Sequence, residues 1–232
     1  MAMKTVLTVI VDNTAAAGAR GEWGLSILVE HRGQTILVDA GASDLFAENL
    51  SKLGFDIKEV DFGVLSHAHY DHANGLPTFF EQNSKAKFYL RDQTALVPHK
   101  TDGLEEIGRR EKMYRRNGNR FRPDDFSHEQ SLVLDTERGL VIINSCSHGG
   151  AVNIINEVKA TFPDKQIYGL IGGFHLFNKS DKEVRRVGRE IKATGVEYVC
   201  TGHCTGDRAY SILKEELGDR LEQLRVGLRI EK

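Results

Sequence analysis

The sequence predicts an α/β (α+β) fold in which two β-sheets pack face to face and helices cover both outer faces, a four-layer αββα sandwich. Two observations lead to this class. The first half of the 232 residues reads mainly as β-hairpins with a few helices, whereas the second half repeats an apolar strand, a polar turn and a helix. Elements that each bury one face stack most simply in such layers. We expect residues 1–232 to form a single domain.

The first half is predicted from apolar runs separated by turn residues. Arg32 and Gly33 separate two apolar runs, which is a hairpin signal. Ser43 or Asp44 is the expected cap of the helix that follows. The expected elements are a strand over 4–11, a hairpin over 24–39, a helix over 43–53, a strand over 60–65, a helix over about 72–82 and a strand over 86–90.

The second half resumes this regular pattern after an irregular stretch. The expected elements are a hairpin around 136–139, a helix over 150–161, a strand over 166–173, a helix over 181–194, a strand over 196–201, a helix over 206–217 and a final strand over 221–230. The irregular stretch, about 91–128, is polar, rich in Arg and Lys, and poor in periodic apolar positions. It is predicted to be a lid-like insertion with one short helix.

Composition narrows the class of protein. The 33 acidic and 31 basic side chains give a net charge of −2, which argues against generic nucleic-acid binding. No apolar run approaches transmembrane length, and the first one meets Asp12 and Asn13 too early for a signal peptide. An odd number of cysteines, three, fits a reduced compartment. We therefore expect a soluble, cytoplasmic protein that binds neither nucleic acid nor membrane.

Four polar turns each follow an apolar strand and carry histidine. Strand ends at one edge of a sandwich are rigid positions from which side chains can converge. The histidines in these turns are His67, His69 and His72 in the first, and His148, His175 and His203 in the other three. His31, His99 and His128 lack this context and are expected on the surface or in the lid.

The first turn has the pattern His-x-His-x-Asp-His, from His67 to His72. Imidazole and carboxylate are preferred ligands of zinc and similar divalent metals. The spacing lets His67 and His69 leave an extended segment on one side, while Asp71 and His72 begin the next helix. The motif is compact enough to serve two adjacent metals. A solvated, histidine-rich loop is the alternative.

These motifs resemble the metallo-β-lactamase superfamily over nearly the whole chain. The resemblance is carried by VDAG at 38–41, SHAHYDH at 66–72, SCSHGG at 145–150 and TGHCTG at 201–206. GLSILVE at 24–30 and GGFHL at 172–176 make it most similar to the branch named for 7,8-dihydropterin-6-ylmethyl-4-(β-D-ribofuranosyl)aminobenzene 5′-phosphate synthase, many of whose members carry only the label of metal-dependent hydrolase.

The resemblance implies a set of metal ligands. These are His67, His69 and His148 for the first metal, and Asp71, His72 and His203 for the second. It also implies that Asp39 orients a ligand histidine from outside the coordination shell; the alternative for Asp39 is a turn residue that ends its strand. The implied cofactor is a pair of divalent ions, with zinc first and manganese or iron as alternatives.

One position departs from the superfamily pattern. Many members have an aspartate that bridges both metals, but residues 172–175 read Gly-Gly-Phe-His. Three roles stay open for His175: terminal ligand, proton donor or substrate contact. Alternation along the strands places Cys146 and Cys204 near the site but pointing away from the ligands, so we expect them to pack rather than to bind metal.

The lid-like insertion contains a dense basic run over 109–122. Arginine forks suit phosphate, so this run is a candidate anion clamp, and its aromatic residues can stack on a flat ring. A solvated charged face is the equally weighted alternative. The candidate substrate residues are Arg109, Arg110, Arg115 and Arg116, together with His175.

Three functions are considered. The first is a metal-dependent hydrolase that uses a metal-activated water on an ester of a small anionic molecule, which we expect to be phosphorylated, with Asp71 as proton acceptor and His175 as proton donor. The second is a group transferase that joins a dihydropterin pyrophosphate to a ribofuranosyl-aminobenzene phosphate and releases pyrophosphate. The third is a non-catalytic metal-binding or ligand-binding module. The oligomeric state is not predicted.

Overall fold

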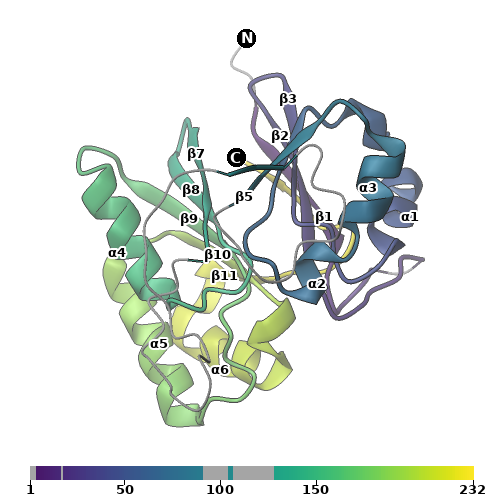
Figure 1. Cartoon of the computed structure of the whole chain (residues 1–232). Coiled ribbons are helices and arrows are strands. Elements are labelled where there is room, and N and C mark those ends of the chain that lie inside the picture. The colour runs from purple at the N-terminus through teal and green to yellow at the C-terminus, as the bar shows by residue number, and fades with distance from the viewer. Residues whose placement is uncertain (1–3, 17, 91–103, 107–127) are drawn as a thin grey trace, which may run out of the picture.

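The computed structural model describes residues 4–16, 18–90, 104–106 and 128–232, and it confirms the predicted αββα sandwich. Two sheets face each other, with α4, α5 and α6 outside one sheet and α1 and α3 outside the other (Figure 1). The helices are α1 Leu45–Lys52, α2 Tyr70–Ala73, α3 Leu76–Gln82, α4 Ala151–Thr161, α5 Asp181–Thr194 and α6 Asp207–Leu217, with 3-10 turns at Ile57–Glu59, His203–Thr205 and Gly218–Arg220.

The first sheet runs in the order β12-β1-β2-β3-β4-β5-β6 within the described residues. Its strands are β1 Val6–Val11, β2 Ser26–His31, β3 Gln34–Val38, β4 Phe62–Val64, β5 Lys87–Leu90, β6 Leu104–Glu106 and β12 Arg229–Glu231. β1, β2 and β3 are antiparallel, whereas β3 to β6 are parallel. The carboxyl ends of β3 and β4 therefore lie at the same edge.

The second sheet runs in the order β11-β10-β9-β8-β7. Its strands are β7 Leu132–Thr136, β8 Gly139–Ile143, β9 Ile167–Gly172, β10 Tyr198–Thr201 and β11 Leu221–Gln223. β8, β9 and β10 are parallel, so the polar turns that follow them meet at one edge of the sheet. This arrangement brings three of the four histidine turns together.

Successive side chains of a strand point to opposite faces of its sheet and therefore enter different hydrophobic cores. Ile27 and Val29 of β2 enter the core between the two sheets, whereas Leu28 enters the core under α1 and α3. In the second sheet, Val141 faces the first sheet and Ile142 faces the outer helices α4, α5 and α6. β1 and β9 are buried along their whole length and β2 and β8 along most of theirs, which explains why these central strands read as continuous apolar runs.

Three predicted elements differ from the structure. The helix expected over 72–82 is two helices, because the N–H of Gly75 donates to the oxygen of Gly41 and not to that of Asp71, which interrupts the helical hydrogen bonds. The final strand over 221–230 is wrong: Gly227, with φ 85°, lets the chain cross between sheets, so β11 and β12 belong to different ones. β6 is an unexpected strand inside the insertion.

Other expectations agree with the structure or lie outside the described residues. Arg32 and Gly33 both have positive φ, as a two-residue hairpin turn requires. Ser43 contributes its hydroxyl to the start of α1, where it accepts the amide N–H of Leu45. The short helix expected in the insertion lies outside the described residues. Among the described helices, none is long and apolar enough to cross a membrane.

Candidate metal centre

The histidine turns of both sheets converge at one edge of the sandwich. His67 and His69 lie in the segment between β4 and α2, and Asp71 and His72 lie in α2 itself. The second sheet supplies the others from the turns after its parallel strands. These are His148 after β8, His175 after β9 and His203 after β10. The structure therefore brings all six predicted ligands, and His175, into one region.

The first ligand group comprises His67, His69 and His148. Nε2 of His67 lies 3.0 Å from Nδ1 of His69 and 3.2 Å from Nε2 of His148. Nitrogens bound tetrahedrally to one zinc ion lie about 3.3 Å apart, given zinc–nitrogen distances of about 2.0–2.1 Å. The spacing of the three imidazoles fits a shared cation.

A hydrogen-bond chain behind the site holds His67. Nδ1 of His67 lies 2.9 Å from Oγ of Ser66, and that hydroxyl donates to Oδ2 of Asp39 over 2.7 Å. Oδ1 of Asp39 also accepts the amide N–H of Ser66. Because the Ser66 hydroxyl uses its proton on Asp39, it accepts from Nδ1 of His67. This leaves the lone pair of Nε2 directed at the ligand group.

The second ligand group comprises Asp71, His72 and His203. Oδ2 of Asp71 lies 3.7 Å from Nε2 of His72 and 3.4 Å from Nε2 of His203. Each ring is held by its other nitrogen. Nδ1 of His72 donates to Oδ2 of Asp39 over 2.8 Å, and Nδ1 of His203 lies 3.2 Å from Oδ1 of Asn13. Both Nε2 atoms thus point toward Asp71, which places two nitrogens and one carboxylate oxygen around one position.

Two features of the cluster fit a bound cation. Nε2 of His203 is buried and has no hydrogen-bond partner within the part of the chain that the structure describes. A buried nitrogen of this kind calls for a partner, and a cation shared with its neighbours is one that fits. In addition, Asp39, Ser147, His175 and His203 all have φ between 47° and 58°, a region that non-glycine residues rarely adopt. Such backbone strain concentrates at functional sites.

The environment of the cluster favours the neutral form of three imidazoles and the charged form of the carboxylate. Burial, with nearby imidazoles, lowers the pKa of His67 and His69, and it lowers the pKa of His148 to about 3. Burial opposes ionisation of Asp71, but contact with His203 and the charge of His72 outweigh it and hold the pKa of Asp71 below its usual range. Neutral imidazoles and an ionised carboxylate are the forms that bind metal.

His72 behaves differently from the other ligand histidines. Burial would lower its pKa, but the charge of Asp39 and the hydrogen bond to it outweigh burial and raise the pKa above the ordinary value. Proton and cation therefore compete for Nε2 of His72, which lies between the two ligand groups.

The two thiols expected to point away from the ligands instead face them. Sγ of Cys146 lies 3.2 Å from Nε2 of His72, and Sγ of Cys204 lies 3.4 Å from Sγ of Cys146. The alternation of side chains along a strand does not predict the direction of Cys146, because the backbone turns at the next residue, Ser147, with φ 52°. Contact with Cys204 and burial raise the pKa of the Cys146 thiol above its usual range, so ionisation would need a nearby cation.

Sequence reasoning missed four further residues. Asn13 and Asp12 follow β1 and hold the ring and the backbone N–H of His203. A polar pair after an apolar strand was the same signal that revealed the histidine turns. Glu129 accepts the backbone N–H groups of residues 148 and 149. His128, expected in the lid, lies at the edge of the first group, with its ring centroid 6.1 Å from that of His67.

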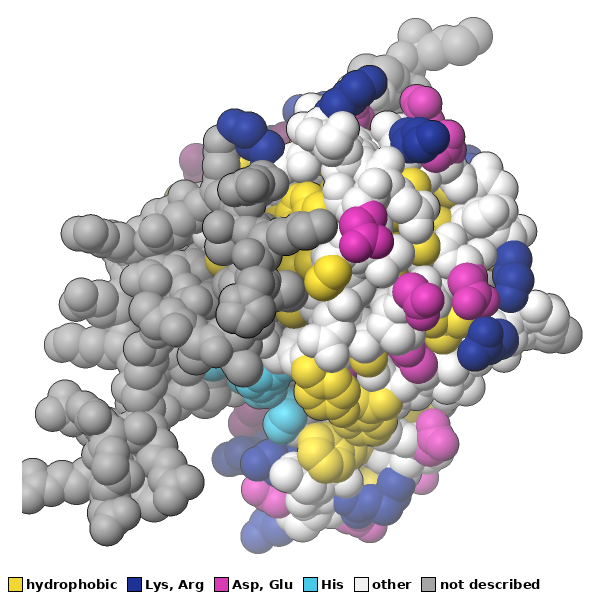
Figure 2. Space-filling model, turned by 45° about the vertical axis from the view of Figure 1, so that its right-hand side comes forward, with side chains coloured by type: hydrophobic (Ala, Val, Ile, Leu, Met, Phe, Trp, Pro, Cys, Tyr) yellow, Lys and Arg dark blue, Asp and Glu magenta, His cyan; other side chains and the backbone are white. Residues whose placement is uncertain are grey.

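Exposed aromatic side chains surround the cluster. Trp23 lies 5.3 Å from His203 and 5.8 Å from Phe177 between ring centroids, and Phe177 lies 5.3 Å from His175. Trp23, Tyr70 and Phe177 are 43%, 59% and 46% exposed, which is unusual for large apolar rings in one region. Histidine side chains reach the surface beside hydrophobic ones in Figure 2. Arg109, Arg110, Arg115 and Arg116 lie outside the described residues.

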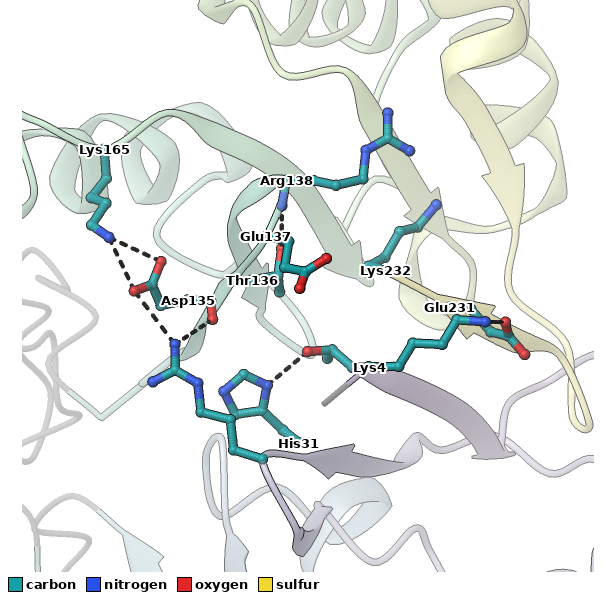
Figure 3. A pocket seen from close by; sticks show the side chains of 11 residues that line it. Lys4, His31, Asp135, Thr136, Glu137, Arg138, Lys165, Glu231 and Lys232 are labelled. Carbon is teal, nitrogen blue, oxygen red and sulfur yellow. Dashed lines mark hydrogen bonds and ion pairs between the residues drawn. The ribbon is translucent and has the colours of Figure 1, made fainter. Parts of the chain in front are cut away.

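A separate cleft lies at the opposite end of the sandwich. Figure 3 shows its lining, which comes from the turn between β2 and β3, the turn between β7 and β8, and both ends of the chain. Its charges are largely paired: Lys165 and Arg32 both contact Asp135, and Lys4 contacts Glu231. His31 lies there too, bonded to Thr5. This cleft shares no residue with the histidine cluster and has no convergent ligands.

Fold and site together define a metal-site protein built on a β-sandwich. A family model described as the metallo-beta-lactamase superfamily matches residues 23–162. The chain belongs to this superfamily, as its motifs indicated.

Individual relatives refine the comparison. The chain is 27% identical to the 7,8-dihydropterin-6-methyl-4-(beta-D-ribofuranosyl)-aminobenzene-5′-phosphate synthase of Methanocaldococcus jannaschii, over 88% of each protein. It is 31% identical to a metal-dependent hydrolase of the beta-lactamase superfamily of known crystal structure, with a TM-score of 0.83 and coverage of 98% and 99%. YhfI of Bacillus subtilis, 15% identical over 99% of each chain with a TM-score of 0.65, shares the fold.

Proposed function

We propose that the protein is a metal-dependent hydrolase that cleaves an ester with a metal-activated water, and that its substrate is a phosphorylated small molecule with a planar ring. One observation carries the proposal. Three ligand histidines, His67, His72 and His203, each have an oxygen acceptor beside Nδ1. Their Nε2 atoms point into the cluster, toward His148 or Asp71. Acceptors in that position are typical of histidines that bind metal.

The proposed cofactor is a pair of divalent ions, with zinc as first choice and manganese or iron as alternatives. His67, His69 and His148 would hold one, and Asp71, His72 and His203 the other. When bound, such ions supply a nucleophile by acidifying water and polarise the bond to be cleaved.

The proton transfers fall to two side chains. Asp71 faces both Nε2 of His72 and Nε2 of His203 at the centre of the cluster, and it is proposed to accept the proton. His175 lies at the open side of the first group, where its ring centroid is 4.4 Å from that of His148. We assign His175 as the proton donor to the leaving group.

The proposed substrate class is based on the exposed aromatic side chains beside the histidine cluster and on the basic run. The exposed rings of Trp23 and Phe177 offer faces and edges on which a planar ring can stack. The basic run at 109–122 is proposed to bind phosphate. The substrate is therefore proposed to be a small anionic molecule. The three cysteines are free, and a cytoplasmic location is proposed because of them.

A group transfer is the second candidate, and the synthase of M. jannaschii favours it through 27% identity over 88% of both chains. In this reading the protein joins a dihydropterin pyrophosphate to a ribofuranosyl-aminobenzene phosphate and releases pyrophosphate. Isotope labelling separates the two reactions. Hydrolysis in water enriched in oxygen-18 puts the label into the product, whereas transfer gives a joined product without it.

The first experiment is elemental analysis of protein purified without chelator. Wild type is expected to hold about two metal ions per chain, and His67→Ala combined with His69→Ala is expected to lose at least the first and to abolish phosphoesterase activity. His31→Ala, in the distant cleft, is the matched control and should keep both. A wild-type protein that binds no zinc, manganese or iron would remove the enzyme proposal.

A further inference from the structure

Cys146 occupies a central position among the ligand atoms. Its buried Sγ forms one potential ligand group with His67 and His72, a second with His148 and His175, and a third with His203 and Cys204. Within each group the ligand atoms lie within 4.8 Å of one another. Cys146 is the one residue shared by all three groups. It therefore lies between the histidines of the first ligand group and those of the second.

The backbone around Cys146 leaves no room for a carboxylate from β9. A Cβ on Gly172 would lie 1.7 Å from the oxygen of Asn144, and a Cβ on Gly173 would lie 2.6 Å from Sγ of Cys204 and 2.7 Å from the oxygen of Ser145. Phe174, the next residue, turns its ring into the core under α4, α5 and α6. The turn that carries Cys146 thus fills the space from which an acidic side chain on 172–174 would reach the metals.

Without a thiolate, the candidate ligands carry too little negative charge to balance two divalent cations. Asp71 is the only carboxylate among the candidate ligand groups of the described residues. Both carboxylate oxygens of Asp39 already accept hydrogen bonds from Ser66 and His72, on the side away from the ligand groups. Two divalent cations surrounded mainly by neutral imidazoles would keep a large uncompensated charge in a buried location, which is unfavourable.

We infer that Cys146 supplies a thiolate ligand to the metal centre and takes the place of the absent bridging carboxylate. This inference rests on the metal centre of the proposed function. A thiolate brings the missing negative charge, and sulfur is a strong ligand for zinc. Cys204 has a supporting position: its sulfur accepts the backbone N–H of His175 and contacts Cys146.

The test uses cobalt as a spectroscopic substitute for zinc. Metal-free protein, kept reduced, is titrated with Co²⁺ while visible and near-ultraviolet absorption are recorded. Wild type should develop visible bands, which report that cobalt is bound, and a near-ultraviolet sulfur-to-metal charge-transfer band, which reports a thiolate ligand. Absence of all bands would argue against the metal centre itself. Visible bands without the charge-transfer band would overturn only the assignment of Cys146.

Three matched variants locate the thiolate. Cys146→Ser should lose the charge-transfer band, keep visible bands, and bind metal at least tenfold more weakly. Cys204→Ser should keep the charge-transfer band. Cys200→Ser changes the third buried cysteine, which belongs to no candidate ligand group, and should match wild type. A band lost in Cys204→Ser but kept in Cys146→Ser would contradict the inference.

A measurement on the unmodified chain covers the case in which Cys146→Ser fails to fold. X-ray absorption of zinc-loaded wild type should show a sulfur scatterer at about 2.3 Å beside nitrogen and oxygen scatterers at about 2.0–2.2 Å. A first shell of nitrogen and oxygen alone would overturn the inference whatever the variant does.

Discussion

Asp39 accepts a hydrogen bond of 2.8 Å from Nδ1 of His72, and both side chains are fully buried. The same carboxylate reaches His67 through the hydroxyl of Ser66. One side chain therefore orients a histidine of each ligand group. Its backbone is held in turn at φ 58°, with its carbonyl accepting the hydroxyl of Ser26.

Asp39→Asn should weaken metal binding roughly 10- to 100-fold, the usual cost of losing a residue that orients a ligand. The amide keeps one acceptor oxygen and loses the negative charge, so it can no longer accept from the Ser66 N–H on one side and from the Ser66 hydroxyl and His72 on the other. Affinity is measured by competition with a chromogenic chelator. Asp61→Asn, which alters an exposed carboxylate that accepts the amide of Thr35, is the control and should match wild type. Equal affinity in the two variants would count against the role of Asp39.

Asn13 should matter to the second ligand group alone. Asn13→Ala removes the acceptor for Nδ1 of His203 and is expected to weaken the more labile metal about tenfold, with the other metal retained. Asn13→Asp keeps an acceptor oxygen and should restore binding. Metal content after dialysis against graded chelator separates the two sites. Failure of the aspartate variant to restore binding would show that Asn13 acts only through packing.

Trp23 is the only tryptophan of the chain, so its fluorescence reports on the mouth of the site without labelling. A ligand with a planar ring should quench this fluorescence as it binds beside His203. Trp23→Ala should raise KM roughly three- to tenfold for a ring-bearing substrate and leave kcat nearly unchanged, because stacking is lost without change to the metals. Phe162→Ala removes an equally exposed ring at the far end of α4 and is the control. A fall in kcat at unchanged KM would contradict the stacking role.

Metal-free protein should lose stability as the pH falls. The pKa of His148 is about 3 in the folded chain and about 6.5 when unfolded. Between these values the unfolded chain binds more protons, so the free energy of unfolding decreases as pH is lowered from about 6.5 toward 3. The lowered pKa values of His67 and His69 act in the same direction, whereas the raised pKa of His72 opposes them.

Denaturant unfolding of the metal-free protein between about pH 7 and pH 5 measures this slope. His148→Gln should give a shallower slope than wild type, because it removes one of the protons taken up on unfolding. Identical slopes would mean that the pKa of His148 is not depressed in the folded protein.

Much of the fold could be predicted because the central strands, such as β1 and β9, are buried on both faces. Leu28 and its neighbours Ile27 and Val29 enter different cores, yet all three are apolar, so the segment stands out against polar turns. The split of 221–230 between two sheets could not be predicted, since an apolar extended segment reads the same in either sheet. Only the positive φ of Gly227 marks the crossing.

The histidines of the site could be predicted from spacing, whereas their supports could not. His67 and His72 are close in sequence, but Asn13 and His203 meet across 190 residues of chain. The thiols were misplaced because strand alternation was extended through a turn where Ser147 reverses the backbone. The alternation of side chains can be predicted only where the backbone is regular. The turns that carry functional residues are often irregular.

Each of the two ligand groups takes residues from both sheets. His67 and Asp71 belong to one side of the sandwich, and His148 and His203 belong to the other. A bound ion would thus cross-link the halves of the molecule. Each tenfold rise in free metal above the dissociation constant would then add about 1.4 kcal/mol to the free energy of unfolding. In a cell that degrades unfolded chains, the abundance of this protein would follow the supply of its metal.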